Sequence, residues 1–180
     1  MNVPFAQTWT EELVAEWLQL DGYVVEIGLP VSITSAGGRF CADVVGARIN
    51  GNQLEIMHVE VGQLAGGGSS IASLKKKFST QNQQSIEQYF IKRFGFSHGN
   101  IVFEKMYVAS FSTGPVIQGA QLLGVQVHPL EDFIKSHVLP TIAAWKKIWQ
   151  SKGKGSDVTL SGADWLLQMI DFLSVYGLLK

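Results

Sequence analysis

The chain has 180 residues, of which 46% are apolar and 16% are charged, and its formal net charge at pH 7 is −1. This composition excludes a disordered chain, because disorder requires low hydrophobicity together with high net charge. The length fits one domain, and no apolar run reaches the roughly 18 residues that a membrane helix needs. The single cysteine allows no internal disulfide, so we expect a cytoplasmic protein without a membrane partner.

The first third of the chain is predicted to form one helix and three strands. Apolar residues recur at helical spacing after Thr10, which can cap the helix, and Asp21-Gly22 ends it. Asn50-Gly51 is the strongest short hairpin signal available and joins the second and third strands. Runs rich in β-forming residues place the three strands at residues 23–27, 40–49 and 53–61.

The remainder alternates predicted helices with two further strands. A glycine- and serine-rich stretch, Gly66 to Ser70, is expected to be a mobile loop before a long helix. A later helix is interrupted near Pro140, and the last helix is capped by Ser161. The expected strands are residues 105–111 and 125–128, and the expected helices are residues 71–94, 119–123, 129–149 and a final segment from 162 onward.

This order of elements predicts an α/β fold with a mixed central sheet flanked by helices. We expect residues 1–150 to form the core and residues 151–180 to form a C-terminal helical extension. The extension carries an apolar stripe that includes Trp165, Phe172 and Tyr176, so it either packs on the core or forms a homodimer interface.

Charge is distributed unevenly along the chain. Residues 1–60 contain eight acidic residues and two arginines, whereas residues 61–180 contain twelve basic and seven acidic residues. Such an arrangement could assemble a cation site beside a surface that binds a polyanion. The alternative is that two exposed faces simply differ in charge.

Two acidic residues stand in otherwise apolar strands. Asp43 and Glu60 flank the hairpin turn, so folding the hairpin brings their carboxylates near one another. A buried carboxylate usually has a cation or a basic partner, and two converging carboxylates suit Mg²⁺ or Mn²⁺. His58 shares the strand face of Glu60, where it either contacts a metal or phosphate or is a hydrogen-bonded core residue.

The helix that ends at Gly22, the Asp43 strand, the hairpin and the segment His58-Val59-Glu60-Val61 together resemble the PD-(D/E)xK nuclease superfamily, which has the restriction-endonuclease-like fold. The resemblance covers residues 10–140 and implies that Asp43 and Glu60 hold a divalent metal. It also implies a lysine two residues after the glutamate, which positions or activates the attacking water. A helix-1 acid often completes the metal site, and Glu11, at the margin of the apolar stripe, is the candidate. The alternative role of Glu11 is to interact with the helix dipole.

The sequence departs from the family pattern at two positions. Ala42 replaces the proline of the motif, and Gly62 replaces its lysine. In the family this lysine sometimes moves to a neighbouring helix. At about 100° per residue, Lys75 lies on the apolar stripe of the next predicted helix, so Lys75 is expected to reach the site. Gln63 follows the glycine directly, and we expect either Lys75 or Gln63 to orient the water. A lysine at a solvated helix edge is the alternative for Lys75.

Two functions follow from the resemblance. The first is a divalent-metal-dependent nuclease that hydrolyses phosphodiesters in DNA. The second is a catalytically inactive protein of the same fold that acts as an interaction or regulatory subunit, oligomeric through its C-terminal helices. A Lys75 amine near both carboxylates favours the first, and a site plugged by side chains, or one in which Asp43 and Glu60 point apart, favours the second. A small-molecule-binding α/β domain is a third hypothesis, supported only by the glycine-rich stretch.

Overall fold

Five strands form one mixed sheet, in the order β1-β2-β3-β4-β5, in the computed structural model of the chain, which describes residues 8–33, 39–64, 67–152 and 159–179. The strands are β1 (Val24–Ile33), β2 (Arg39–Asn50), β3 (Gln53–Leu64), β4 (Asn100–Ser112) and β5 (Gln126–Pro129). The helices are α1 (Trp9–Leu20), α2 (Gly67–Lys77), α3 (Thr80–Phe94), α4 (Gly114–Gln121), α5 (Leu130–Phe133), the π-helical turn η1 (Ile134–Val138), α6 (Leu139–Ser151) and α7 (Trp165–Val175).

The strand directions follow from the connections. Strands β1, β2 and β3 are antiparallel neighbours, and β2 and β3 are joined by the tight turn at Asn50-Gly51, where Gly51 has φ +59°. Strands β4 and β5 run parallel to β3, because α2 and α3 cross over between β3 and β4, and α4 crosses over between β4 and β5. The predicted mixed α/β sheet is therefore confirmed.

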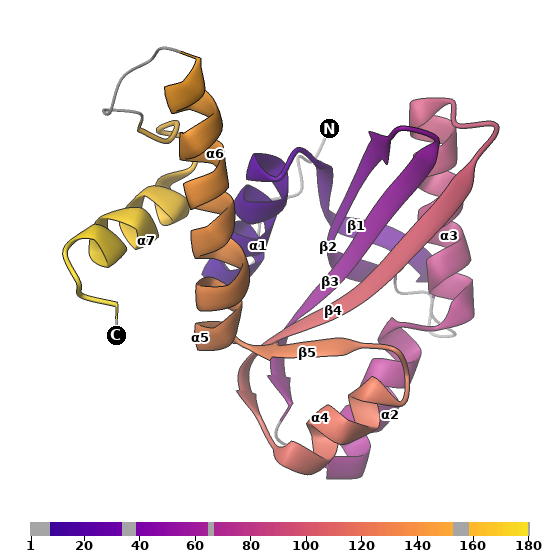
Figure 1. Cartoon of the computed structure of the whole chain (residues 1–180). Helices are drawn as coiled ribbons and strands as arrows, with labels where there is room; N and C mark the ends of the chain where they lie inside the picture. The colour runs from indigo at the N-terminus through magenta and orange to yellow at the C-terminus, as the bar shows by residue number, and fades with distance from the viewer. Residues whose placement is uncertain (1–7, 34–38, 65–66, 153–158, 180) are drawn as a thin grey trace.

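Helices cover both faces of the sheet (Figure 1). On one face, α1, α6 and α7 pack in a cluster that contains Val44 and Val59. On the other face, α3 packs with Val45 and Ile56, and α2 and α4 pack beside Tyr107 of β4. No helix among the described residues is long and apolar enough to cross a membrane.

Several helix boundaries differ from the sequence-based expectation, among them α4, which begins at Gly114 and not at residue 119. The side chain of Thr8, not that of Thr10, caps α1 by accepting a hydrogen bond from the backbone N–H of Glu11. The expected long helix over 71–94 is two helices, because Ser79 has an extended backbone and its hydroxyl caps α3 by accepting from the N–H of Asn82. Of the expected mobile loop, residues 67–70 are helical and belong to α2, and Gly66 lies outside the described residues.

The C-terminal region packs on the core through one face of α7. Leu166, Leu167 and Ile170 are buried in the cluster that contains α1, while the predicted apolar stripe, represented by Trp165 and Phe172, is exposed. The cap of α7 is Asp164 rather than Ser161. The predicted interruption near Pro140 is a π-helical turn: η1 separates α5 from α6 and leaves Pro140 in the first turn of α6, where its missing N–H is tolerated.

The position of α2 depends on the burial of Leu74, which is fully shielded from solvent in the cluster around Tyr107. We expect Leu74→Ala to lower the free energy of unfolding by about 3 kcal/mol, because the lost methyl groups leave a cavity. Lys75→Ala, one residue further along on the exposed side, is the control and should change it by less than about 0.5 kcal/mol. Urea denaturation measures both, and equal effects would contradict this packing of α2.

Candidate active site

Asp43 and Glu60 lie on adjacent antiparallel strands and face the same side of the sheet. Val44 of β2 pairs with Val59 of β3, so Asp43 and Glu60 occupy the next position of the register. Residues directly opposite one another in a sheet project to the same face. The Asp43 carboxylate also accepts a hydrogen bond from the backbone N–H of Val61 at 3.0 Å. The predicted convergence of the two acids is therefore confirmed.

A lysine ammonium bridges the two carboxylates. Lys77 is the last residue of α2, and its Nζ donates to Asp43 Oδ2 at 3.2 Å and to Glu60 Oε2. The side chain of Lys77 is 22% exposed and that of Asp43 is 24% exposed, while Glu60 is fully buried. Two strands and the end of a helix thus bring one cation and two anions together.

The prediction that Lys75 is the lysine of this cluster is wrong. Lys75 is exposed, and Lys77 contacts the carboxylates. The error came from treating residues 71–94 as one helix with its apolar stripe through Phe78. In α2 the inward direction is set by Leu74, and a residue three positions later lies on the same face of a helix.

Glu60 is held from both sides. Its Oε1 lies 2.7 Å from Nε2 of His58, and its Oε2 accepts from Lys77. His58 is 1% exposed, and its ring lies 4.7 Å from that of Phe78, measured between centroids. Of the two roles considered for His58, the structure shows the hydrogen-bonded core histidine. Because it contacts Glu60, it also fixes the orientation of that carboxylate.

The charges in the cluster act on one another. Burial and the neighbouring charge of Glu60 raise the pKa of Asp43 to about 6, against the lowering effect of Lys77. Burial alone would raise the pKa of Glu60, but the hydrogen bond and charge of His58, with the Lys77 ammonium, hold it below its usual value. The two carboxylates raise the pKa of Lys77 although burial opposes this. Asp43 is therefore the least well neutralised member of the cluster.

Gly62, at the position where the motif has a lysine, has no room for a side chain. Its φ is +146°, and a Cβ built on it would lie 2.8 Å from the hydroxyl oxygen of Tyr107. The register of β3 with β4 shifts directly after it, as in a β-bulge. Tyr107 is 5% exposed and pairs with Glu60 across the strands. Gln63, the other residue predicted to orient water, is exposed and has no interaction with the two carboxylates among the described residues.

Glu11 lies in the first turn of α1 and is 7% exposed. Its helix packs on the sheet face that carries Val44 and Val59, whereas Asp43 and Glu60 face the other side with Lys77. Across the described part of the chain, no group of three or more histidine, cysteine or acidic residues is arranged to hold a metal ion. The role of Glu11 as a third ligand stays a prediction.

Sequence reasoning missed two members of the site. Lys77 could have been found from Ser79, because a serine inside an apparent helix is a candidate cap and marks the end of the preceding helix. Tyr107 carries no local signal, since it reaches the site only through the parallel pairing of β3 with β4.

Comparison with known proteins does not place the chain in a family. No family model matches it, and no curated protein matches it. Among solved structures, the crystal structure of a protein of unknown function, AF1548, aligns with a TM-score of 0.39 and 12% sequence identity over 94% of this chain and 78% of that one. A similarity at this level carries no argument about fold or function.

The raised pKa of Asp43 predicts a pH dependence of stability. Between about pH 4 and pH 6 the folded protein holds this proton more tightly than the unfolded chain, so stability falls as the pH rises through that window. Asp43→Asn removes the titration, and its stability relative to wild type should increase by about 2 kcal/mol between pH 4 and pH 7. Urea denaturation across this range tests it, and a difference that does not vary with pH would contradict the burial and charge assigned to Asp43.

Because Gly62 is crowded by Tyr107, we expect that adding one methyl group at this position destabilises the protein. Gly62→Ala should lower the free energy of unfolding by about 2 kcal/mol, from backbone strain and the contact with the Tyr107 hydroxyl. Gly68→Ala is the matched control, because its Cβ meets no atom within 4 Å and alanine favours a helix such as α2. We expect Gly68→Ala to be neutral or stabilising in thermal denaturation, and two equally stable variants would rule out the tight contact at Gly62.

Proposed function

We propose that the protein is a divalent-metal-dependent phosphodiesterase that cleaves DNA, with Asp43, Glu60 and Lys77 at its centre. The observation that carries the proposal is the contact of one lysine ammonium with two carboxylates from adjacent strands. The same three residue types form the centre of the PD-(D/E)xK site that the sequence resembles. Lys77 then takes the role of the lysine that Gly62 replaces in the motif.

The donor set fits Mg²⁺ or Mn²⁺. Mg²⁺ in such sites is commonly held by one or two carboxylates, and water and substrate phosphate oxygens complete its coordination. Two carboxylates with one ammonium leave an excess of negative charge, and the charge of Glu60 adds to the effect of burial in raising the pKa of Asp43. Asp43 and Glu60 would be the protein ligands. A metal ion held there would lower the pKa of a water molecule that it coordinates and would neutralise charge on the phosphoryl group.

Each residue of the cluster has its own role in the proposed reaction. Asp43 and Glu60 orient the reacting groups from two rigid strands, and His58 keeps the Glu60 carboxylate in place from the buried side. Lys77 orients the attacking water with its ammonium protons and stabilises the charge that develops on the phosphate. The water oxygen forms a bond to phosphorus as the bond from phosphorus to the leaving ester oxygen breaks; the attacking water gives up one proton to the solvent, and the leaving oxygen takes one proton from the solvent.

DNA is the proposed substrate because the site has a basic border. Lys75 and Lys76 precede Lys77 on α2 and are exposed, so they can contact phosphates on either side of the scissile one. This role replaces the one predicted for Lys75 inside the site. Contacts of this kind bind the backbone without reading base sequence.

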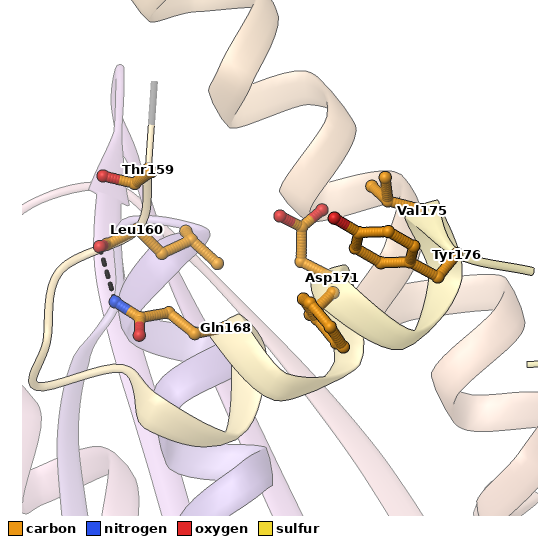
Figure 2. A pocket seen from close by; sticks show the side chains of 7 residues that line it. Thr159, Leu160, Gln168, Asp171, Val175 and Tyr176 are labelled. Carbon is orange, nitrogen blue, oxygen red and sulfur yellow. Dashed lines mark hydrogen bonds between the residues drawn. The ribbon is translucent and has the colours of Figure 1, made fainter. Parts of the chain in front are cut away.

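An inactive interaction subunit is the second candidate, and the exposed stripe on α7 favours it. Trp165, Met169, Phe172 and Tyr176 are each about half exposed or more, and a surface helix with such a stripe is typical of a protein interface. A groove of about 520 Å³ lies between residues 159–160 and α7 (Figure 2). Figure 2 also shows Gln168 donating to the carbonyl of Leu160 at its edge. A homodimer through the C-terminal helices would cover this stripe.

Cleavage of supercoiled plasmid DNA in the presence of Mg²⁺ or Mn²⁺ tests the proposed activity. We expect the wild-type protein to nick the plasmid, and we expect Lys77→Met and Asp43→Asn each to lower the rate by about 100-fold or more, because the first removes the ammonium that orients the water and the second removes a metal ligand. Lys75→Met is the control on the same helix and should retain activity within about threefold, since it contacts only a flanking phosphate.

Calorimetric titration with Mn²⁺ separates the two candidate functions. A wild-type protein that neither binds Mn²⁺ nor nicks the plasmid would favour the inactive subunit. Nicking that persists in Lys77→Met would contradict the proposed site.

A further inference from the structure

Tyr107 places a hydroxyl group at the candidate active site. On β4, Tyr107 pairs with Glu60 of β3. The hydroxyl oxygen of Tyr107 lies 2.8 Å from the position that a Cβ atom on residue 62 would occupy. The charges of Lys77, Asp43 and Glu60 all act on this phenol. The hydroxyl therefore lies where a side chain would leave β3 two residues after Glu60.

Packing explains the ring of Tyr107 but not its hydroxyl. The ring is buried in the cluster that contains Leu64 and Leu74, and a phenylalanine would fill the same space. No hydrogen bond from the hydroxyl to another side chain or backbone group is present among the described residues, and the hydroxyl is not among their buried atoms that lack a partner, so it is open to solvent. A tyrosine whose ring is buried and whose O–H group is open to solvent can donate a hydrogen bond to a molecule that binds beside it. Here the neighbouring groups are a lysine and two carboxylates in the proposed catalytic cluster.

We propose that the Tyr107 hydroxyl is a substrate contact of this site and donates a hydrogen bond to a non-bridging oxygen of the phosphodiester being cleaved. The assignment rests on the proposed function. It explains the glycine at position 62: the space that the motif fills with a side chain from β3 is filled here by a hydroxyl from β4 and an ammonium from α2.

The chemistry of the phenol fits this role. Burial raises the pKa of Tyr107, so the group remains O–H at neutral pH and is a hydrogen-bond donor. A neutral donor can approach a phosphate oxygen without adding charge to a cluster that already holds one ammonium. The ring is held by strand pairing and core packing, so the donor is oriented before the substrate binds. No proton leaves the phenol in this step.

Single-turnover cleavage of a labelled DNA duplex in saturating Mn²⁺ tests the assignment. Tyr107→Phe should cleave roughly 10- to 100-fold more slowly than wild type, the effect of removing one oriented donor from a developing anion. Its affinity for Mn²⁺ and its thermal midpoint should match those of the wild-type protein. Tyr176→Phe, an exposed tyrosine on α7, is the control and should cleave at the wild-type rate.

A sulfur substitution in the substrate separates a contact from a structural effect. Duplexes carrying sulfur at one or the other non-bridging oxygen of the scissile phosphate are cleaved by both proteins, and the effect of sulfur on the metal is common to both. We expect one of the two diastereomers to slow wild type several-fold more than it slows Tyr107→Phe, because the variant has already lost the hydrogen bond.

Three results would overturn the assignment. Tyr107→Phe that cleaves at the wild-type rate, or that shows the wild-type response to both sulfur substitutions, would remove the hydroxyl from the reaction while leaving the proposed function intact. A wild-type protein that cleaves no DNA with either metal would overturn the proposed function and, with it, this contact.

Discussion

The buried carboxylate of Glu60 constrains everything around it. A carboxylate without partners in that position costs several kcal/mol, so the fold must bring hydrogen-bond donors to both of its oxygens. His58 does so from two residues earlier on the same strand, and Lys77 does so from the end of α2. The first partner comes with the strand itself, but the second requires that α2 end at the correct residue and pack through Leu74. The position of α2 and the charge of Glu60 therefore depend on one another.

The same constraint explains the unusual backbone beyond Glu60. Because Lys77 enters from α2, residue 62 need not supply a cation, and Tyr107 of the neighbouring parallel strand occupies the space above it. A glycine with φ +146° is then the residue that fits. Asp43 remains under-neutralised beside this arrangement, and its pKa is raised first by burial and then by the neighbouring charge of Glu60. Such a cluster is suited to a divalent cation and to an anionic substrate whose charge that cation balances.

Local sequence patterns predicted a large part of this arrangement, but they could not predict which strands pair when the strands are far apart in the sequence. The Asn50-Gly51 turn fixes the register of β2 and β3, so the convergence of Asp43 and Glu60 could be predicted from the sequence. The choice of Lys75 failed because the break at Ser79 was missed, which changes the face that α2 buries. Tyr107 could not be predicted, because two helices separate β3 from β4 and no short motif records their parallel register.

The most direct test of the account is anomalous X-ray diffraction from crystals of the wild-type protein soaked in Mn²⁺. The account predicts one strong peak about 2.2 Å from oxygens of both Asp43 and Glu60, with the Lys77 ammonium moved away from at least one of them while His58 keeps its contact with Glu60. A crystal in which no manganese binds at this position, and in which Lys77 still bridges both carboxylates, would contradict it. Lys77 would then be a structural counter-ion that closes the site.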